Sequence, residues 1–451
     1  MFVPERGKRM IQMTLKQLLI EGNSQEMVKL IAEMHPADVA ETLIEVPLEN
    51  QINLINTVLS EMGALILREM DLTDQAAILS QLTSEKAADI LKQMYTDEAA
   101  DLLAILPQTE TMTLLALMGD KGKEVKKLLA YESDTSGGLM ATEFITVKEE
   151  QTIEEVLLFL REQAPSTESA YYLYVEAADR RLVGVVSLRT LVTKPLTTKV
   201  SEVMYRDVIS VPEDMDQEEV ARLFEKYGFL VLPVVDEQEK LIGVITLDDV
   251  LGVAEEEATE DIHKAASIIP MKEAYIDASI WTLFSKRVIW LLGLIVLNLL
   301  SSEVIAAYES VLASALTLAF FIPLLIDTGG NTGSQSATLV VRALVTGDIK
   351  LSDWGKILLK EIMVGAFLGV VLGVAGMTLG FFRGGYQIGV VVGLTMGAIV
   401  IFSNIVGMIL PFILTKMKLD PAVASSPLIT SVCDIAGLAI YFSIASWVFG
   451  F

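Results

Sequence analysis

The sequence contains very few residues that bind soft metals or form covalent cross-links. Cys433 is its only cysteine, and His35 and His263 are its only histidines. A single cysteine excludes a disulfide bond within the chain and fits a soluble region in a reducing cytosol. Two histidines leave little or no material for a histidine-rich zinc site, an HExxH helix or a Ser-His-Asp triad. We also expect no signal peptide, because Lys16 and Glu21 interrupt the apolar segment near the N-terminus.

Charge is distributed unevenly along the 451 residues. The chain is 52% hydrophobic and yet has a net charge of −25. Residues 288–451 contain eight acidic and seven basic residues and therefore carry −1, which leaves −24 on residues 1–287. The pattern predicts an acidic soluble half joined to a nearly neutral membrane half. Such a soluble half should repel nucleic acid and anionic lipid and attract cations.

Residues 1–131 are predicted to form an all-α domain of stacked short helices. Similar amphipathic segments recur at 36–40, 85–91 and 98–103, each with leucine or isoleucine on one face. Short helices of this kind cannot bury their apolar faces alone, so we expect them to stack as a small superhelix. Acidic residues at helix starts, such as Asp97 and Glu98, are usually caps or partners of the helix dipole.

An internal duplication follows, in residues 132–200 and 201–254. MATEFITV (140–147) matches MYRDVISV (204–211), and LVGVVS (182–187) matches LIGVIT (241–246). Each copy is predicted to contain a strand, a helix, two further strands and a helix. The order and spacing resemble those of a tandem pair of α/β CBS domains.

The resemblance to CBS domains implies a possible nucleotide site. In that family a Gly-x-x-Ser/Thr-x-x-Asp signature often contacts a ribose. The second copy has this signature in Gly243, Thr246 and Asp249, whereas the first copy has Thr190 in place of the acid. An adenine nucleotide such as ATP is one interpretation, and a purely structural, dimerising CBS pair is the other.

Residues 255–285 are predicted to form an acidic connecting helix. Five of the seven residues from 255 to 261 are acidic. A run of this kind is normally a solvated face. Because this one leads directly to the membrane half, the alternative is that the acids lie beneath a pore.

Residues 286–451 are predicted to form a transmembrane domain with five helical spans. Each of five apolar segments is long enough to cross a bilayer: 288–308, 314–341, 357–382, 387–414 and 424–449. With the N-terminal half in the cytosol, eight lysines and arginines flank the spans inside and only Arg383 lies outside. The C-terminus then lies outside. An odd number of spans gives no inverted repeat, so a symmetric pore would need a second subunit.

Residues 320–344 combine helix breakers with polar side chains at membrane depth. Pro323, Gly329, Gly330 and Gly333 lie among aspartate, asparagine, glutamine, serine and threonine residues. We expect a broken segment, which is tolerated within a membrane only against protein or a water-filled cavity. A face for close helix packing is one interpretation, and the wall of an ion or solute path is the other.

Asp434 is an ionisable residue inside the last span, and such a residue is a functional candidate. The alternative is a neutral or paired aspartate that stabilises the bundle, but no basic residue lies in the same span. Ser426, Thr430 and Asp434 recur every four residues and so share one helical face. Set against Asn331 and Thr338, this face would form a lining rich in oxygen. Mg²⁺ fits such a lining, because it is usually bound through one or two carboxylates and retained waters.

The order of these domains resembles the MgtE family of magnesium transporters. The matching motifs are DTSGGLM (134–140), EATEDIH (257–263), GGNTGSQ (329–335) and DPA (420–422), followed by Asp434. The resemblance implies a homodimer in the cell membrane, with a pore on the dimer axis lined by the second and fifth spans. It implies selectivity for Mg²⁺ and closure by cytosolic Mg²⁺. Ser426 stands where the family has asparagine.

The resemblance also implies the roles of individual residues. Asp434 would hold the hydrated ion. Glu260 and Asp261 would lie on a gating helix near Asp420. Further sensor sites for Mg²⁺ on the soluble domains would draw on other acids. The candidates are Asp97, Glu98, Asp214, Asp216, Asp248 and Asp249.

Three functions are compatible with this organisation, and none of them is enzymatic. The first is a Mg²⁺ channel with feedback gating. The sequence has no Walker A motif, so transport would run down the electrochemical gradient. The second is an exporter of divalent cations coupled to protons or Na⁺. Coupling needs a second titratable group in the membrane, and we expect Asp327 to be the only candidate. The third is a nucleotide-sensing membrane scaffold that transports nothing.

Overall fold

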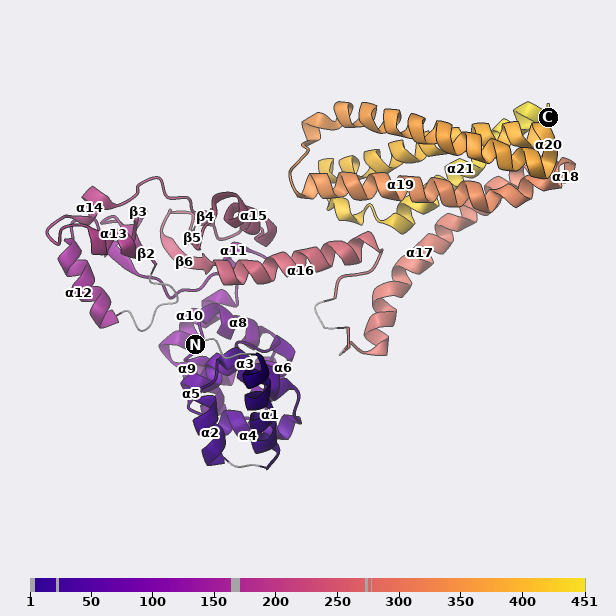
Figure 1. Cartoon of the computed structure of the whole chain (residues 1–451). Coiled ribbons are helices and arrows are strands. Elements are labelled where there is room, and N and C mark those ends of the chain that lie inside the picture. Colours follow the sequence, from indigo (N-terminus) through magenta and orange to yellow (C-terminus); the bar gives the residue numbers. More distant parts are fainter. Residues whose placement is uncertain (1–4, 22–23, 164–170, 272–274, 277, 451) are drawn as a thin grey trace. The chain divides into compact units, whose positions relative to one another are not determined.

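The structure is a computed structural model, and it describes residues 5–21, 24–163, 171–271, 275–276 and 278–450 (Figure 1). The chain divides into two compact units, residues 1–254 and 255–451. We describe each unit by itself. The first contains the helical domain and the duplicated α/β domains, and the second contains the apolar helices.

The N-terminal helices stack in two interleaved rows. From α3 to α9 each odd-numbered helix contacts the next odd-numbered helix, and from α2 to α8 each even-numbered helix contacts the next even-numbered one. The shared core includes Leu43, Leu67, Leu91 and Leu103, all fully buried or nearly so. The predicted superhelix is therefore confirmed. The helices are α1 Glu5–Glu21, α2 Ser24–Ile31, α3 Pro36–Ile44, α4 Leu48–Thr57, α5 Ser60–Leu67, α6 Leu72–Leu79, α7 Ser84–Leu91, α8 Thr96–Ala104, α9 Gln108–Met118 and α10 Asp120–Leu128.

The two copies of the duplication have the same topology. In each three-stranded sheet the first strand is parallel to the second, which is antiparallel to the third. Val147 is paired with Val175 in the first copy, as Val211 is with Val234 in the second. The predicted tandem α/β pair is confirmed. Its elements are α11 Ser136–Leu139, β1 Thr146–Lys148, α12 Ile153–Gln163, β2 Tyr172–Glu176, β3 Leu182–Ser187, α13 Leu188–Thr193, α14 Val200–Val203, β4 Val211–Pro212, α15 Gln217–Tyr227, β5 Val231–Val235, β6 Leu241–Thr246 and α16 Leu247–Ala265.

Each copy packs a methionine onto a glycine of the other copy. A Cβ added to Gly243 would lie 2.5 Å from Met140 Sδ, and one added to Gly184 would lie 2.7 Å from Met204 Sδ. These distances leave no room for a side chain. Gly243, which we predicted as part of a ribose contact, is therefore needed for packing between the copies.

The acidic connecting helix differs in extent from the predicted 255–285. It is the C-terminal part of α16, which begins at Leu247 and ends at Ala265. Ser267 then adopts a positive φ of 58°, and Pro270 follows. A residue in the left-handed conformation interrupts a right-handed helix. The residue before Pro270 also disfavours the α-helical conformation, so the helix cannot continue to residue 285.

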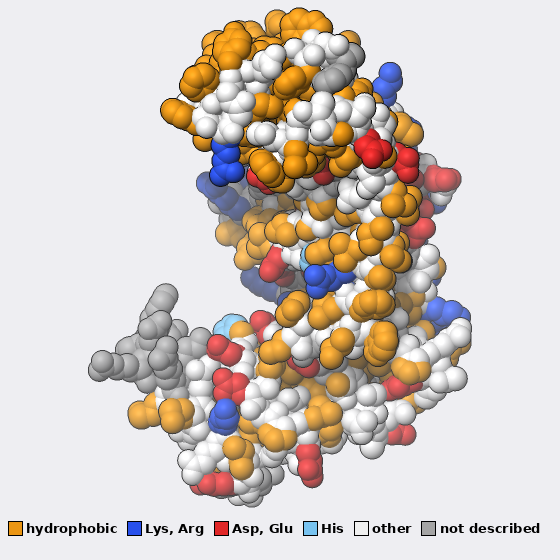
Figure 2. All heavy atoms as spheres, turned by 90° about the vertical axis from the view of Figure 1, so that its right-hand side faces the viewer, with side chains coloured by type: hydrophobic (Ala, Val, Ile, Leu, Met, Phe, Trp, Pro, Cys, Tyr) orange, Lys and Arg blue, Asp and Glu red, His pale blue; other side chains and the backbone are white. Residues whose placement is uncertain are grey.

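The second unit is a bundle of long apolar helices. Among the described residues, three helical stretches are long and apolar enough to cross a membrane: Ile280–Ala307, Leu351–Lys416 and Ser426–Phe449. Their hydrophobic side chains cover much of the upper part of Figure 2. The elements are α17 Ile280–Ala307, α18 Glu309–Ser314, the 3₁₀ turn η2 Leu316–Phe321, α19 Ile322–Val345, η3 Leu351–Asp353, α20 Trp354–Lys416, η4 Pro421–Val423 and α21 Ser426–Phe449.

Helix α20 is two helices joined at a sharp turn. A straight helix of its 63 residues would be about 95 Å long, far more than a bilayer needs. Gly385 has φ 78° and ψ −170°, which reverses the chain. A Cβ on Gly380 would lie 2.8 Å from Gly389 Cα, so the two halves lie side by side as a glycine-lined hairpin. Helices α17, α19, the halves of α20 and α21 thus take the places of the five predicted spans.

Helix α19 runs without a break through its glycines, so the predicted break at this segment is wrong. Pro323 lies in the first turn, where its missing N–H is not required by the helix. The buried Gly329, Gly330 and Gly333 instead let α19 approach its neighbours closely. A Cβ on Gly329 would lie 2.6 Å from Ile399 Cγ2, and one on Gly333 would lie 2.9 Å from Ile429 Cγ2.

Candidate functional site

Helix α19 carries a stripe of polar side chains on the face away from its glycines. Asp327, Asn331, Ser334 and Thr338 follow a spacing of four, three and four residues, which places them on one helical face. Asp327, Asn331 and Thr338 are exposed, and Ser334 is partly so. Asn331 Nδ2 donates to Asp327 Oδ2 at 3.1 Å, so neighbouring members of the stripe point toward each other.

Helix α21 presents a second stripe, formed by the predicted residues Ser426, Thr430 and Asp434. Ser426 Oγ donates to Ser334 Oγ at 2.8 Å, which joins the two stripes at the N-terminal end of α21. One turn on, a Cβ on Gly330 would lie 2.8 Å from Thr430 Cγ2. The structure therefore brings all five predicted pore residues onto two adjoining helices, α19 and α21 (Figure 1).

We call the line along which the two stripes adjoin the seam. Asp434 lies one turn beyond Thr430 along it and is half-buried. Its Oδ1 atom is enclosed and has no hydrogen-bond partner among the described residues. Asp327 on α19 lies within electrostatic reach of it. Two carboxylates on facing helices with amide and hydroxyl oxygens beside them form an oxygen-rich lining of the kind that hard cations prefer.

A second polar cluster lies at the interface of α19 with α20 and was not predicted from the sequence. Ser336 Oγ donates to Glu361 Oε2 at 2.9 Å and lies 3.1 Å from the carbonyl oxygen of Asn404. Asn404 Nδ2 donates to the carbonyl oxygen of Glu361 at 3.3 Å. Glu361 falls inside the predicted span 357–382, and an acidic residue within a span was the signal that could have found it.

The predicted gating residues meet around a lysine. Lys264 Nζ forms ion pairs with Glu260 and with Asp420 Oδ2, the latter at 2.5 Å. Burial lowers the pKa of Lys264, but the carboxylates of Asp420 and Glu260 outweigh burial and hold this pKa above its usual value. The ammonium group is therefore charged at neutral pH. Asp261 is half-buried in the same turn of α16.

In the first unit, α8 and the start of α16 bring three predicted sensor acids close together: Glu98, Asp248 and Asp249. The fourth, Asp97, precedes Glu98 in the first turn of α8. Arg68 Nε pairs with Glu98 Oε1 at 3.2 Å and lies within electrostatic reach of Asp248. Burial raises the pKa of Asp249 to about 6, and the charges of Asp248 and Glu98 add to this effect. Hydrogen bonds from Thr246 act in the opposite direction.

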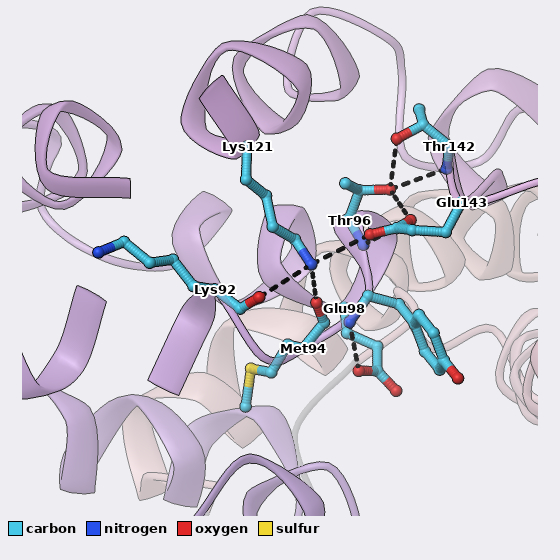
Figure 3. A network of polar contacts seen from close by, with 8 residues as sticks. Lys92, Met94, Thr96, Glu98, Lys121, Thr142 and Glu143 are labelled. Atoms are coloured by element: carbon cyan, nitrogen blue, oxygen red, sulfur yellow. Dashed lines mark hydrogen bonds and ion pairs between the residues drawn. The ribbon is translucent and has the colours of Figure 1, made fainter. Parts of the chain in front are cut away.

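A network of polar contacts fixes the start of α8 beside this cluster (Figure 3). Thr96 Oγ1 donates to Glu143 Oε2 at 2.7 Å, and Thr142 N donates to Thr96 Oγ1 at 2.8 Å. Lys121 pairs with Glu143 Oε1 at 3.0 Å and also donates to the carbonyl oxygen of Met94. The network connects α10 and the turn before α8 to the segment that enters the first CBS copy.

Asp214 and Asp216 lie at the start of α15 and are exposed. Asp216 Oδ1 accepts a hydrogen bond from Glu218 N at 2.9 Å, so this side chain caps the helix. The structure thus gives Asp216 a structural role. No group of three or more His, Cys, Asp or Glu side chains in the described part of the chain is arranged to hold a metal ion.

A cavity in the CBS pair is lined mainly by the first copy, together with Leu230 of the second, whereas we predicted the nucleotide residues at the second copy. It has a volume of about 630 Å³. Its lining includes Tyr171, Tyr172, Ser187 and Arg189. In the second copy the Thr246 hydroxyl lies 2.5 Å from Asp249 Oδ2 and 2.6 Å from Asp248 Oδ1, so the predicted ribose residues bond to one another.

Family models match the N-terminal domain, the CBS pair and most of the membrane domain. A model described as a divalent cation transporter matches residues 322–444. A model described as the MgtE intracellular N domain matches residues 34–134, and a CBS domain model matches residues 137–196 and 200–256. The matches follow the order of domains that the sequence predicts.

Two curated relatives are similar over most of their length. The magnesium transporter MgtE of Thermus thermophilus is 45% identical over 322 residues, which are 71% of this chain and 72% of the relative. The magnesium transporter MgtE of Bacillus subtilis is 32% identical over 431 residues, which are 95% of each protein.

Two solved structures resemble the soluble half. The soluble part of a magnesium transporter has a TM-score of 0.53 and 31% identity, and covers 56% of this chain and 99% of that one. The cytosolic domain of the Mg²⁺ channel MgtE in complex with ATP has a TM-score of 0.52 and 38% identity, and covers 54% of this chain and 99% of that one.

Asp249 should make the stability of the soluble half fall as the pH rises. Its carboxyl has an ordinary pKa of 3.8 and a folded-state pKa of about 6. The stability that protonation contributes is complete below pH 3.8 and is lost as the pH rises through 6, with a fall of roughly 1 kcal/mol between pH 5 and pH 7. Urea unfolding of fragment 1–265 at both pH values, with a metal chelator present, measures this fall.

The variant Asp249→Asn should remove most of that difference, because it cannot ionise. Asp214→Asn, at an exposed position, serves as the matched control and should behave as the wild type does. If the free energy of unfolding changes equally between pH 5 and pH 7 in wild type and in Asp249→Asn, then groups other than Asp249 cause the change.

Proposed function

Because the chain belongs to the MgtE family of magnesium transporters, we propose that it conducts Mg²⁺ passively through a pore between two subunits. Flow would follow the electrochemical gradient. The soluble half would lie in the cytosol and the C-terminus outside, as the excess of basic residues at the inner flanks indicates.

The observation that carries this proposal is the pair of polar stripes on α19 and α21. Both stripes expose polar groups in one subunit, and hydrocarbon cannot satisfy such groups. They must face water or another protein surface. A second copy placed against this seam would duplicate both stripes and enclose a polar path.

Mg²⁺ suits the groups that the stripes offer. The ion loses its waters reluctantly and is usually held by one or two carboxylates and retained waters. Asp434 from each of two subunits would supply two carboxylates. The amide and hydroxyl groups of Asn331, Ser334 and Thr430 would hydrogen-bond to the waters around the ion.

We further propose that cytosolic Mg²⁺ closes the pore. Residues 1–287 carry −24, so two subunits bring a large negative charge together. Mg²⁺ at the acids near Asp249 and near Asp420 would offset this repulsion and favour a compact, closed state. Such a shift requires that the closed state bind Mg²⁺ more tightly than the open one.

The cavity at the first CBS copy is proposed to bind an adenine nucleotide. Its volume of about 630 Å³ lies in the range of small-molecule sites. Tyr171 offers an aromatic face for a base, and the exposed Arg189 offers a guanidinium group for phosphates. A solved relative of the soluble half was crystallised with ATP.

Asp327 and Glu361 favour a second candidate, an exporter coupled to protons or Na⁺. Coupling needs a titratable group besides Asp434 within the membrane. Asp327 on α19 lies within electrostatic reach of Asp434, and Glu361 on α20 lies at the interface with α19. Flux assays with and without a proton gradient separate this candidate from passive flow.

Asp434→Asn should abolish Mg²⁺ flux or reduce it by roughly tenfold or more, because it removes the charge that holds the ion and keeps the shape of the side chain. Uptake into liposomes, reported by a Mg²⁺-sensitive dye, measures the rate, and size-exclusion chromatography confirms assembly. Asp348→Asn, which removes an exposed carboxylate from the loop after α19, is the matched control. Unchanged flux in Asp434→Asn would contradict the pore assignment.

Tyr171→Ala should weaken ATP binding to fragment 1–265 by roughly fivefold or more, because it removes the aromatic face on which a base would stack. Titration calorimetry measures the affinity. Asp249→Ala, in the second copy, should leave it unchanged. The opposite pattern, with loss only in Asp249→Ala, would place the nucleotide at the second copy, and no heat in the wild type would leave the CBS pair without a nucleotide.

A further inference from the structure

Lys264 occupies the position between Glu260 and Asp420 where a cation is expected. Its Nζ pairs with both carboxylates, and the three side chains are 23%, 40% and 32% exposed. Glu260 lies one turn before Lys264 on α16, whereas Asp420 lies in the loop between α20 and α21. The lysine therefore tethers the end of the connecting helix to the membrane bundle within the second unit.

A second contact holds the same segment. Ser267 Oγ and Ser425 Oγ lie 2.6 Å apart and are 6% and 1% exposed as residues. Lys286 Nζ donates to the carbonyl oxygen of Pro270 at 2.8 Å, which fixes the following residues to the start of α17. These contacts attach the segment after α16 to the bundle.

We propose that Lys264 is an internal cation that competes with Mg²⁺ for Glu260 and Asp420. It thereby sets the Mg²⁺ concentration at which the ion replaces the lysine as the bridge between these carboxylates and protects the segment after α16 further. The proposal rests on the proposed feedback by Mg²⁺ and names the residue that tunes it.

The competition follows from the charges and the geometry. The ammonium group brings one positive charge and donates to both carboxylates, whereas Mg²⁺ brings two charges and keeps most of its waters. Both cations need the same carboxylate oxygens, so Mg²⁺ must displace the ammonium group. The side chain of Lys264 is partly exposed and can swing into water. Part of the binding free energy of Mg²⁺ is then spent in breaking the two ion pairs.

The test uses the full-length protein in detergent and the variant Lys264→Gln. Hydrogen–deuterium exchange of the backbone amides of residues 264–271 is measured over a series of Mg²⁺ concentrations. The variant should exchange faster than the wild type without Mg²⁺, because its tether is lost. Its Mg²⁺ midpoint for protection should fall by roughly threefold to tenfold, the size expected when one or two partly exposed ion pairs need not be broken.

Two further variants serve as controls. Lys416→Gln removes the same charge from an exposed position in the last turn of α20. This side chain forms no ion pair with a described residue, so the variant should keep the midpoint within about twofold of wild type, since exposed charges without a direct partner are screened. Lys264→Arg keeps a cation between the carboxylates and should also stay close to wild type.

The outcomes separate this proposal from the feedback on which it rests. A midpoint in Lys264→Gln that equals or exceeds that of wild type would show a simple tether and overturn the competition. Protection by Mg²⁺ in Lys264→Gln but not in wild type would support the competition, although wild type would then lack feedback at this site. If Mg²⁺ protects neither protein, both the competition and the feedback are overturned. If the Mg²⁺ midpoint falls equally in Lys416→Gln, the effect comes from general electrostatics, which also overturns the competition.

Discussion

Hydrocarbon offers no hydrogen bonds, and this constraint determines what α19 can do. The helix has two unlike faces. On one face Gly329, Gly330 and Gly333 remove all side-chain bulk and let the backbone pack against α20 and α21. On the other, polar groups from Asp327 to Thr338 stay exposed within the subunit. The close packing holds the helix in place, and the polar face then has to meet water or a second subunit. The proposed pore is the arrangement that satisfies both faces at once.

Electrostatics imposes a related constraint on the acidic clusters of both units. Acidic residues gather near Asp249 and around Asp420, and the chain places one of its own basic groups at each cluster. Arg68 pairs with Glu98 beside the first cluster, and Lys264 pairs with Glu260 and Asp420 at the second. These groups offset part of the repulsion between the carboxylates. In the proposed account they also make Mg²⁺ compete for the carboxylates, so the response begins only when the ion is abundant.

Features that repeat along the chain could be predicted from the sequence, whereas features that depend on one tertiary contact could not. The CBS duplication and the helical superhelix leave periodic patterns, and both are confirmed. The stripe of Ser426, Thr430 and Asp434 follows from helical spacing alone, but the role assigned to each of its members stays a prediction. The break expected at Gly329 was wrong because glycine marks close packing as well as disruption, and only the neighbours Ile399 and Ile429 decide between them. The pairing of Lys264 with Asp420 joins residues 156 positions apart and leaves no local pattern.

The central claim is that the stripe on α19 lines an aqueous path, and the labelling of single cysteines tests it most directly. In a background with Cys433 replaced by serine, Ser334→Cys, Thr338→Cys and Leu339→Cys would each be treated with a charged, water-soluble thiol reagent in liposomes. Leu339 neighbours Thr338 on the same helix and is 70% exposed within the subunit, so it reports the apolar side. The account predicts labelling at positions 334 and 338 that is roughly tenfold faster than at 339, because the reagent cannot enter hydrocarbon. Equal labelling at the three positions, or faster labelling at 339, would contradict it.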